Sequence, residues 1–112
     1  MATISNLYID QGTTFSTIID LTNQDGSPMN LTSFTVQSQI RKSYQSSTFY
    51  NFTATVYDSP LNGQVRLQLA PSTSSNMRAG RYLYDIEITN TTTSDKYRVL
   101  EGIVVVSPEI TR

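Results

Sequence analysis

The stretch QVRLQLA, residues 64–70, decides the fold class. Its apolar side chains occupy every second position, at Val65, Leu67 and Leu69. The positions before and between them hold the polar side chains of Gln64, Arg66 and Gln68. An alternation with a period of two is the pattern of a β-strand that has one face in a core and the other in water. The stretch therefore predicts a strand with its leucines buried and its glutamines exposed.

The same alternation recurs on both sides of this stretch. The segments expected to form strands are 4–9, 13–21, 34–41, 48–58, 64–70, 81–90 and 96–108. Besides the residues above, the side chains expected in the core are those of Phe15, Ile19, Phe34, Val36, Tyr82, Tyr84 and Ile86, and Gln37 is expected in water. Seven or eight short strands separated by turn signals are typical of an antiparallel β-sandwich.

Residues 71–80, PSTSSNMRAG, interrupt the alternation. Pro71 suits the first turn of a helix, the serines suit a helix cap, and Gly80 suits a helix end. One short helical turn is therefore expected between two strands. The chain as a whole, residues 1–112, is expected to be a single β-sandwich domain with short polar arms at residues 1–6 and 107–112.

The composition limits the chemistry that the chain can perform. It has 112 residues and a formal net charge of −1, and it contains neither cysteine nor histidine. Disulfides, thiolate metal sites and the usual general base near neutral pH are therefore excluded. The balanced charge makes nucleic acid a poor partner, and no apolar run approaches the length of a membrane span. We expect a protein without enzymatic activity, metal or cofactor.

Four segments taken in order resemble a known group of proteins. They are IDQGTTF (9–15), IDLTNQDGSPMNLTSFTVQSQIRKS (19–43), GQVRLQLAPSTSSNMRAGRYLYDIEI (63–88) and YRVLEGIVVVSPEITR (97–112). Their order resembles that in small virion proteins of T4-like and cyanobacterial tailed bacteriophages, and is similar to the N-terminal domain of phage baseplate upper proteins. The resemblance implies an Ig-like sandwich located in the virion and made in the cytoplasm of the host bacterium. It implies no catalytic residues.

Two polar motifs could carry chemistry. Asp25 in NQDGS could belong to a calcium loop, but no glutamate follows at the spacing of an EF-hand loop, so a simple turn is expected. Asp85 and Glu87 share one face of a strand, and paired carboxylates can act as acid and base in glycoside cleavage. The plain alternation around them instead predicts a solvated face. Three arginines are candidate cross-strand partners for these carboxylates: Arg41, Arg66 and Arg98.

The segment RKSYQSSTFYNF, residues 41–52, is a first candidate for a protein interface. It places Arg41, Tyr44, Phe49 and Tyr50 around a polar loop. Tyrosine and arginine are common anchors at protein interfaces. The alternative is that the two adjacent aromatic residues only cover the end of the core.

The segment GIVVV, residues 102–106, is a second candidate. It is apolar in both registers, and a strand that is apolar on both faces is usually covered on both faces. Val104 and Val106 are therefore expected on an outer face that a neighbouring subunit covers. The alternative is that they are strand-favouring residues on an open surface.

These observations leave three functions open. The first is a structural subunit of a phage virion, an accessory or decoration protein of the head that acts through protein–protein contacts. The second is an adaptor in the tail or baseplate. The third, from another class, is a carbohydrate-binding module. The expected partners are other virion proteins or further copies of the chain, and not nucleic acid or a membrane.

Overall fold

The computed structural model describes residues 3–110, which form mostly β-strands. The eight strands are β1 (Thr3–Ile4), β2 (Leu7–Asp10), β3 (Phe15–Asp20), β4 (Phe34–Arg41), β5 (Phe49–Val56), β6 (Gln64–Leu69), β7 (Gly80–Asn90) and β8 (Lys96–Ser107). A 3₁₀ turn, η1 (Pro60–Asn62), precedes β6, and a short helix, α1 (Pro71–Ser74), precedes β7. The all-β fold expected from the alternation is confirmed.

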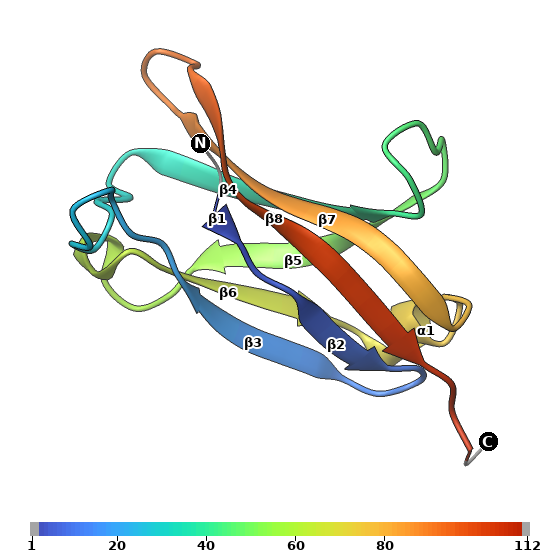
Figure 1. Cartoon of the computed structure of the whole chain (residues 1–112). Helices are drawn as coiled ribbons and strands as arrows, with labels where there is room; N and C mark the ends of the chain where they lie inside the picture. Colours follow the sequence, from blue (N-terminus) through green and yellow to red (C-terminus); the bar gives the residue numbers. More distant parts are fainter. Residues whose placement is uncertain (1–2, 111–112) are drawn as a thin grey trace.

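The strands form two layers that share β5 (Figure 1). Sheet A contains β8, β7, β4 and the first half of β5, with β1 and β2 along the outer side of β8. Sheet B contains the second half of β5, then β6 and β3. Residues 49–52 of β5 pair with β4, and residues 53–56 pair with β6. Because one strand belongs to both layers, the sandwich is closed on that side.

The N-terminal strands differ from the expectation of a purely antiparallel sandwich. Both β1 and β2 run parallel to β8, with Ile4 opposite Glu101 and Tyr8 opposite Val105. Residues 3–4 therefore form a strand of the sheet, and residues 5–6 are hydrogen-bonded to β8, so this segment is not an arm. The rest of the expected arm, residues 1–2, and its counterpart at residues 111–112 lie outside the described residues. The single strand expected at residues 4–9 is thus two short strands. Their parallel direction was not predicted, because pairing depends on residues distant in the sequence.

Gly102 leaves room for the segment that joins β1 to β2, because the backbone of Ser5 passes close to β8 at this position. A Cβ atom at this position would lie 1.8 Å from the carbonyl oxygen of Ser5, far inside van der Waals contact. The hydroxyl of Tyr84 donates a hydrogen bond of 2.7 Å to the same carbonyl oxygen. The side-chain oxygen of Asn6 accepts a hydrogen bond of 3.1 Å from the N–H of Ile103. These contacts hold the interruption between the two N-terminal strands against β8.

The core lies between the two sheets, where the alternation placed it. Val65 and Leu67 are 0% exposed, and the other buried residues expected there are Leu69, Ile19, Tyr82, Tyr84 and Ile86. Three expected members are only half-buried and pack against the margin of this core: Phe15, Phe34 and Val36. Gln37 and Gln68 are exposed as predicted. Gln64 and Arg66 are half-buried on the outer face, where the Arg66 guanidinium lies 4.7 Å from the centre of the Tyr57 ring.

The helical turn expected after Pro71 is present as α1, but its ends differ from the expectation. The N-cap residue is Ala70, so no side chain caps the N-terminus, and Gly80 starts β7 instead of ending the helix. Ser74 is fully buried and donates a hydrogen bond of 2.9 Å to the carbonyl of Thr13. The hydroxyl of Tyr82 donates a hydrogen bond of 2.7 Å to the carbonyl of Arg78. A tyrosine that bonds back to the corner before its own strand is typical of Ig-like sandwiches.

Candidate functional site

The outer face of sheet A carries an open groove of about 410 Å³. It crosses β4, β7 and β8, and Gln39, Asp85 and Arg98 are among its lining residues. The side chains point outward because they alternate with the buried positions of the same strands. Tyr44, in the loop between β4 and β5, borders the groove and is 73% exposed. The groove therefore combines charged and amide groups with one exposed aromatic ring.

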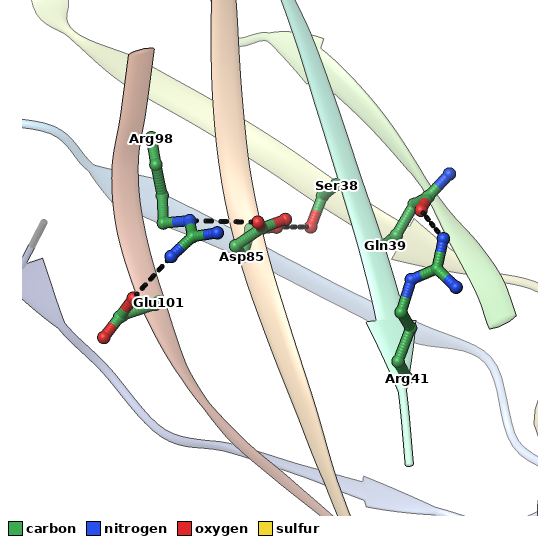
Figure 2. A network of polar contacts seen from close by, with 6 residues as sticks. All are labelled: Ser38, Gln39, Arg41, Asp85, Arg98 and Glu101. Carbon is green, nitrogen blue, oxygen red and sulfur yellow. Dashed lines mark hydrogen bonds and ion pairs between the residues drawn. The ribbon is translucent and has the colours of Figure 1, made fainter. Parts of the chain in front are cut away.

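Arg98 joins the carboxylates on this face, as Figure 2 shows. Its Nε lies 3.2 Å from a carboxylate oxygen of Asp85, and its Nη1 lies 3.3 Å from a carboxylate oxygen of Glu101. The prediction that Asp85 lies on an outward face and pairs with a cross-strand arginine is confirmed. Of the three candidate arginines, the partner is Arg98. Pairs of this exposure contribute about 0–1 kcal/mol, so the pair orients the side chains more than it stabilises the fold.

Asp85 is a carboxylate whose pKa is shifted by its surroundings. Partial burial raises its pKa, and repulsion from Glu87 and Glu101 acts in the same direction. Arg98 opposes these effects through its charge and its hydrogen bond. From the neighbouring strand β4, the hydroxyl of Ser38 donates a hydrogen bond of 2.6 Å to the backbone carbonyl of Asp85 (Figure 2). The arrangement is a cluster of like charges around one arginine, which can bind polar groups of a partner.

The residues of the first candidate interface do not all lie together in the structure. The Arg41 guanidinium lies 4.7 Å from the centre of the Phe49 ring and donates a hydrogen bond of 3.1 Å to the side chain of Gln39. Arg41 also bonds the carbonyl of Ser46 inside the loop. The structure therefore brings Arg41 and Phe49 together, at the same end of sheet A as Tyr44.

Tyr50 turns to the opposite side of β5 from Phe49. It is half-buried, packs edge-on against Tyr82 with ring centres 6.3 Å apart, and donates a hydrogen bond of 3.3 Å to the carbonyl of Asn76. The alternative that these aromatics cover the end of the core is thus correct for Tyr50. Phe49 is 42% exposed and does not belong to the core.

The register of β8 corrects the prediction for the second candidate interface. Val104 and Val106 are 0% and 2% exposed, so the expectation that they lie on an outer face is wrong. They share a face with Leu100, which pairs with Ile86 in the core. The sequence contained a signal for this register. Glu101 has to face water, and a period of two places Ile103 and Val105 on the same face as Glu101.

Four side chains therefore form an apolar surface that sequence reasoning missed, and we call it the outer patch: Tyr8, Leu83, Ile103 and Val105. Leu83 lies opposite Ile103, and Tyr8 lies opposite Val105, so the four are neighbours across β7, β8 and β2. Tyr8 is 71% exposed, and the other three are half-buried on the same outer face. Ile4, also 71% exposed, extends the patch beside Glu101.

The remaining motif, around Asp25, forms a local turn. One carboxylate oxygen accepts hydrogen bonds of 2.6 and 2.9 Å from the hydroxyl and the N–H of Ser27. Both bonds lower the pKa of Asp25, and the bond from the hydroxyl has the larger effect. Within residues 3–110, no three acidic side chains come together to hold a metal ion, and no helix is long and apolar enough to cross a membrane.

Comparison with known proteins finds similarity only among solved structures. No protein-family model and no curated protein matches the chain. Among solved structures, InlP from Listeria monocytogenes is similar over 92% of this chain, with 15% identity and a TM-score of 0.49. A family 123 glycoside hydrolase from Clostridium perfringens is similar over 98% of it, with 12% identity and a TM-score of 0.44. The chain spans 26% and 24% of their lengths, and likenesses this distant bear neither on its function nor on the virion resemblance.

Proposed function

We propose that this protein is a non-enzymatic interaction module that binds another protein through the outer face of sheet A. The observation that supports this proposal is the outer patch beside the polar groove. Interfaces commonly have an apolar centre with a polar rim, and aromatic side chains are enriched in them. Here the centre is Leu83, Ile103 and Val105, the aromatic side chains are Tyr8 and Tyr44, and the rim is the cluster around Arg98.

The resemblance to phage virion proteins suggests the setting of this contact. In that setting the protein is an accessory or decoration subunit of the phage head, and the outer patch faces a capsid protein. An adaptor in the tail or baseplate is the alternative, with the same surface on a different partner. A further copy of the chain is another candidate for the opposite side of the contact. A specific contact of this type buries roughly 800 Å² on each partner.

The decisive variant adds charge to the patch without touching the core. Ile103→Asp combined with Val105→Asp places two carboxylates at half-buried outward positions. Each tenfold loss of affinity corresponds to about 1.4 kcal/mol, and two unpaired charges in an apolar contact cost more than that. We expect phage particles carrying the variant to contain less than about a tenth of the normal copy number, counted by quantitative mass spectrometry.

A matched control adds the same charge to the outer face of sheet B. Ser16→Asp combined with Thr55→Asp changes one exposed position of β3 and one of β5. This control should keep its copy number in the particle, and both variants should retain the circular dichroism and melting temperature of a folded domain. A folded patch variant with unchanged copy number would remove the outer patch from the contact. Absence of the protein from purified particles would refute the virion setting itself.

Carbohydrate binding is a second candidate, favoured by one observation. Tyr44 is 73% exposed at the border of a groove that also carries the amides of Gln37 and Gln39. Exposed rings beside amide groups suit the faces and hydroxyls of sugars. A glycan array should then show binding that Tyr44→Ala abolishes while the fold is retained. Binding that survives this substitution, or no binding at all, would exclude the groove as a sugar site.

A further inference from the structure

A second cleft, separate from the outer patch, lies at the end of the sandwich next to α1. Its volume is about 490 Å³, within the range of small ligand sites. One wall is the hairpin between β4 and β5, including Lys42 and Ser46, and the other is the segment from Asn76 to Tyr82 that leads into β7. Two segments that are distant in the sequence therefore form one concave surface.

The charges in this cleft have one sign. Lys42 and Arg78 line it, and no acidic residue does. The Lys42 ammonium lies 4.7 Å from the centre of the Tyr82 ring and against the backbone at Gly80. In the part of the chain that the structure describes, the ion pairs within 4.0 Å all belong to Arg98 on the other surface. The cleft thus presents two cations without carboxylate partners.

The walls of the cleft are held in place by aromatic side chains. Tyr82 donates a hydrogen bond to the carbonyl of Arg78, and Tyr50 donates one to the carbonyl of Asn76. The two rings meet edge-on, with centres 6.3 Å apart. Burial raises the pKa of Tyr82, with repulsion from Tyr50 second, so its hydroxyl keeps its proton at neutral pH. The segment that carries Arg78 is therefore positioned before any ligand binds.

These features favour an anionic ligand over an uncharged sugar. A sugar ring binds to the open face of an aromatic ring, but Lys42 lies over the Tyr82 ring and Tyr50 is half-buried. A carboxylate needs only the cations and nearby hydrogen-bond donors such as the side chains of Thr48 and Asn76. The chain as a whole has a net charge of −1, so attraction of an acidic ligand has to be local.

We propose that the cleft between Lys42 and Arg78 binds acidic side chains on an exposed segment of the partner protein. The inference rests on the proposed function, because that function is the reason to expect a protein as the ligand. It adds a second contact that recognises charge, at a distance from the apolar outer patch. Contacts of this kind increase the association rate and the specificity of a complex, and salt weakens them.

The test is an NMR titration of the ¹⁵N-labelled full chain at low ionic strength. The probe is a blocked peptide with two adjacent glutamates, and the comparison peptide has glutamines in their place. We expect saturable shifts of the backbone amides at Lys42, Ser46, Asn76 and Arg78 with the glutamate peptide only. Inorganic phosphate serves as the free-anion arm and should bind more weakly than the peptide, because it is a single anionic group whereas the peptide carries two.

Variants of the two cations complete the test. Lys42→Ala and Arg78→Ala should each weaken binding roughly two- to fivefold, the range for losing one exposed ion pair. Lys96→Ala makes the same change in net charge at the distant tip between β7 and β8 and should leave binding unchanged. Equal shifts with the glutamine peptide, equal weakening by Lys96→Ala, or binding of phosphate alone would each overturn the proposal. None of these results would bear on the outer patch, because the probe lacks an apolar surface.

Discussion

At the scale of single residues, Gly102 decides how the N-terminal strand meets β8. Replacing it with alanine would place a Cβ atom 1.8 Å from the carbonyl oxygen of Ser5, a backbone atom that cannot rotate aside as the end of a side chain could. We expect Gly102→Ala to lower the free energy of unfolding by about 1–3 kcal/mol, the range for overpacking. Chemical denaturation measures this loss, and hydrogen exchange should show faster exchange of the amides in residues 3–10.

Gly26→Ala provides the control for Gly102→Ala. Gly26 has a φ of 87° but open space around it, so alanine there is strained without a clash. Its substitution costs about 1–2 kcal/mol through the left-handed backbone alone. Amide exchange in residues 3–10 should then remain as in the parent chain. Similar exchange in the two variants would show that Gly102 has no special role in docking the N-terminal strand.

Tyr84 predicts a specific loss of stability at alkaline pH. Burial raises the pKa of Tyr84 from 10.0 to about 12, although its hydrogen bond to Ser5 acts in the opposite direction. Between these two values the unfolded chain releases the proton and the folded chain keeps it. The free energy of unfolding should therefore fall as the pH rises from 10.0 to about 12. The stabilisation that comes from the protonated Tyr84 is fully present below pH 10.0.

Tyr84→Phe isolates this effect, because phenylalanine does not titrate. The variant should be less stable at neutral pH by about 0.5–1.5 kcal/mol, since it loses the hydrogen bond to Ser5. Its stability should decline less steeply than that of the parent chain above pH 10.0. Urea denaturation at a series of pH values measures both quantities. Parallel curves for the two proteins would contradict the assignment of the raised pKa to Tyr84.

At the scale of secondary-structure elements, the two faces of β8 should respond differently to charge. Val104 is 0% exposed in the core, so Val104→Asp should prevent folding or destabilise the domain by more than about 3 kcal/mol. Val105→Asp points outward beside Tyr8 and should leave a folded, cooperatively melting protein. Circular dichroism melts of the pair provide the measurement. A stable Val104→Asp variant would mean that the register of β8 is wrong.

The strands that the sequence predicted best are those with one polar face. β6 alternates strictly, so a single register satisfies both water and core, and its leucines are buried as expected. β8 is apolar in both registers between residues 102 and 106, so local pattern alone did not decide which valines face the core. The pair between Asp85 and Arg98 was among the expected options because carboxylates on one face require a cross-strand partner. The groove and the outer patch depend on strand order, which a local pattern does not contain.

At the scale of the whole molecule, the N-terminal strands complete the sandwich. Leu7 and Ile9 of β2 are 9% and 1% exposed in the core, and the backbone of β2 covers the outer edge of β8. Deleting residues 1–10 should expose this edge and leave a gap in the core, which favours edge-to-edge association. We expect a truncated chain that melts at lower temperature and forms higher oligomers in analytical ultracentrifugation. A monomeric truncated chain of unchanged melting temperature would show that β2 contributes little to the fold.

The parallel pairing of the first strands with the last has a mechanical consequence. Because β2 and β8 run in the same direction, a force that pulls the two ends of the chain apart acts along both strands in opposite senses. The hydrogen bonds between them are then loaded together in shear, whereas an antiparallel pair joined at its tip would open one bond at a time. The domain should therefore resist tension between its ends better than tension applied across β7 and β8. Stretching single molecules by force spectroscopy, with the attachment points placed at either pair of positions, would reveal this direction dependence.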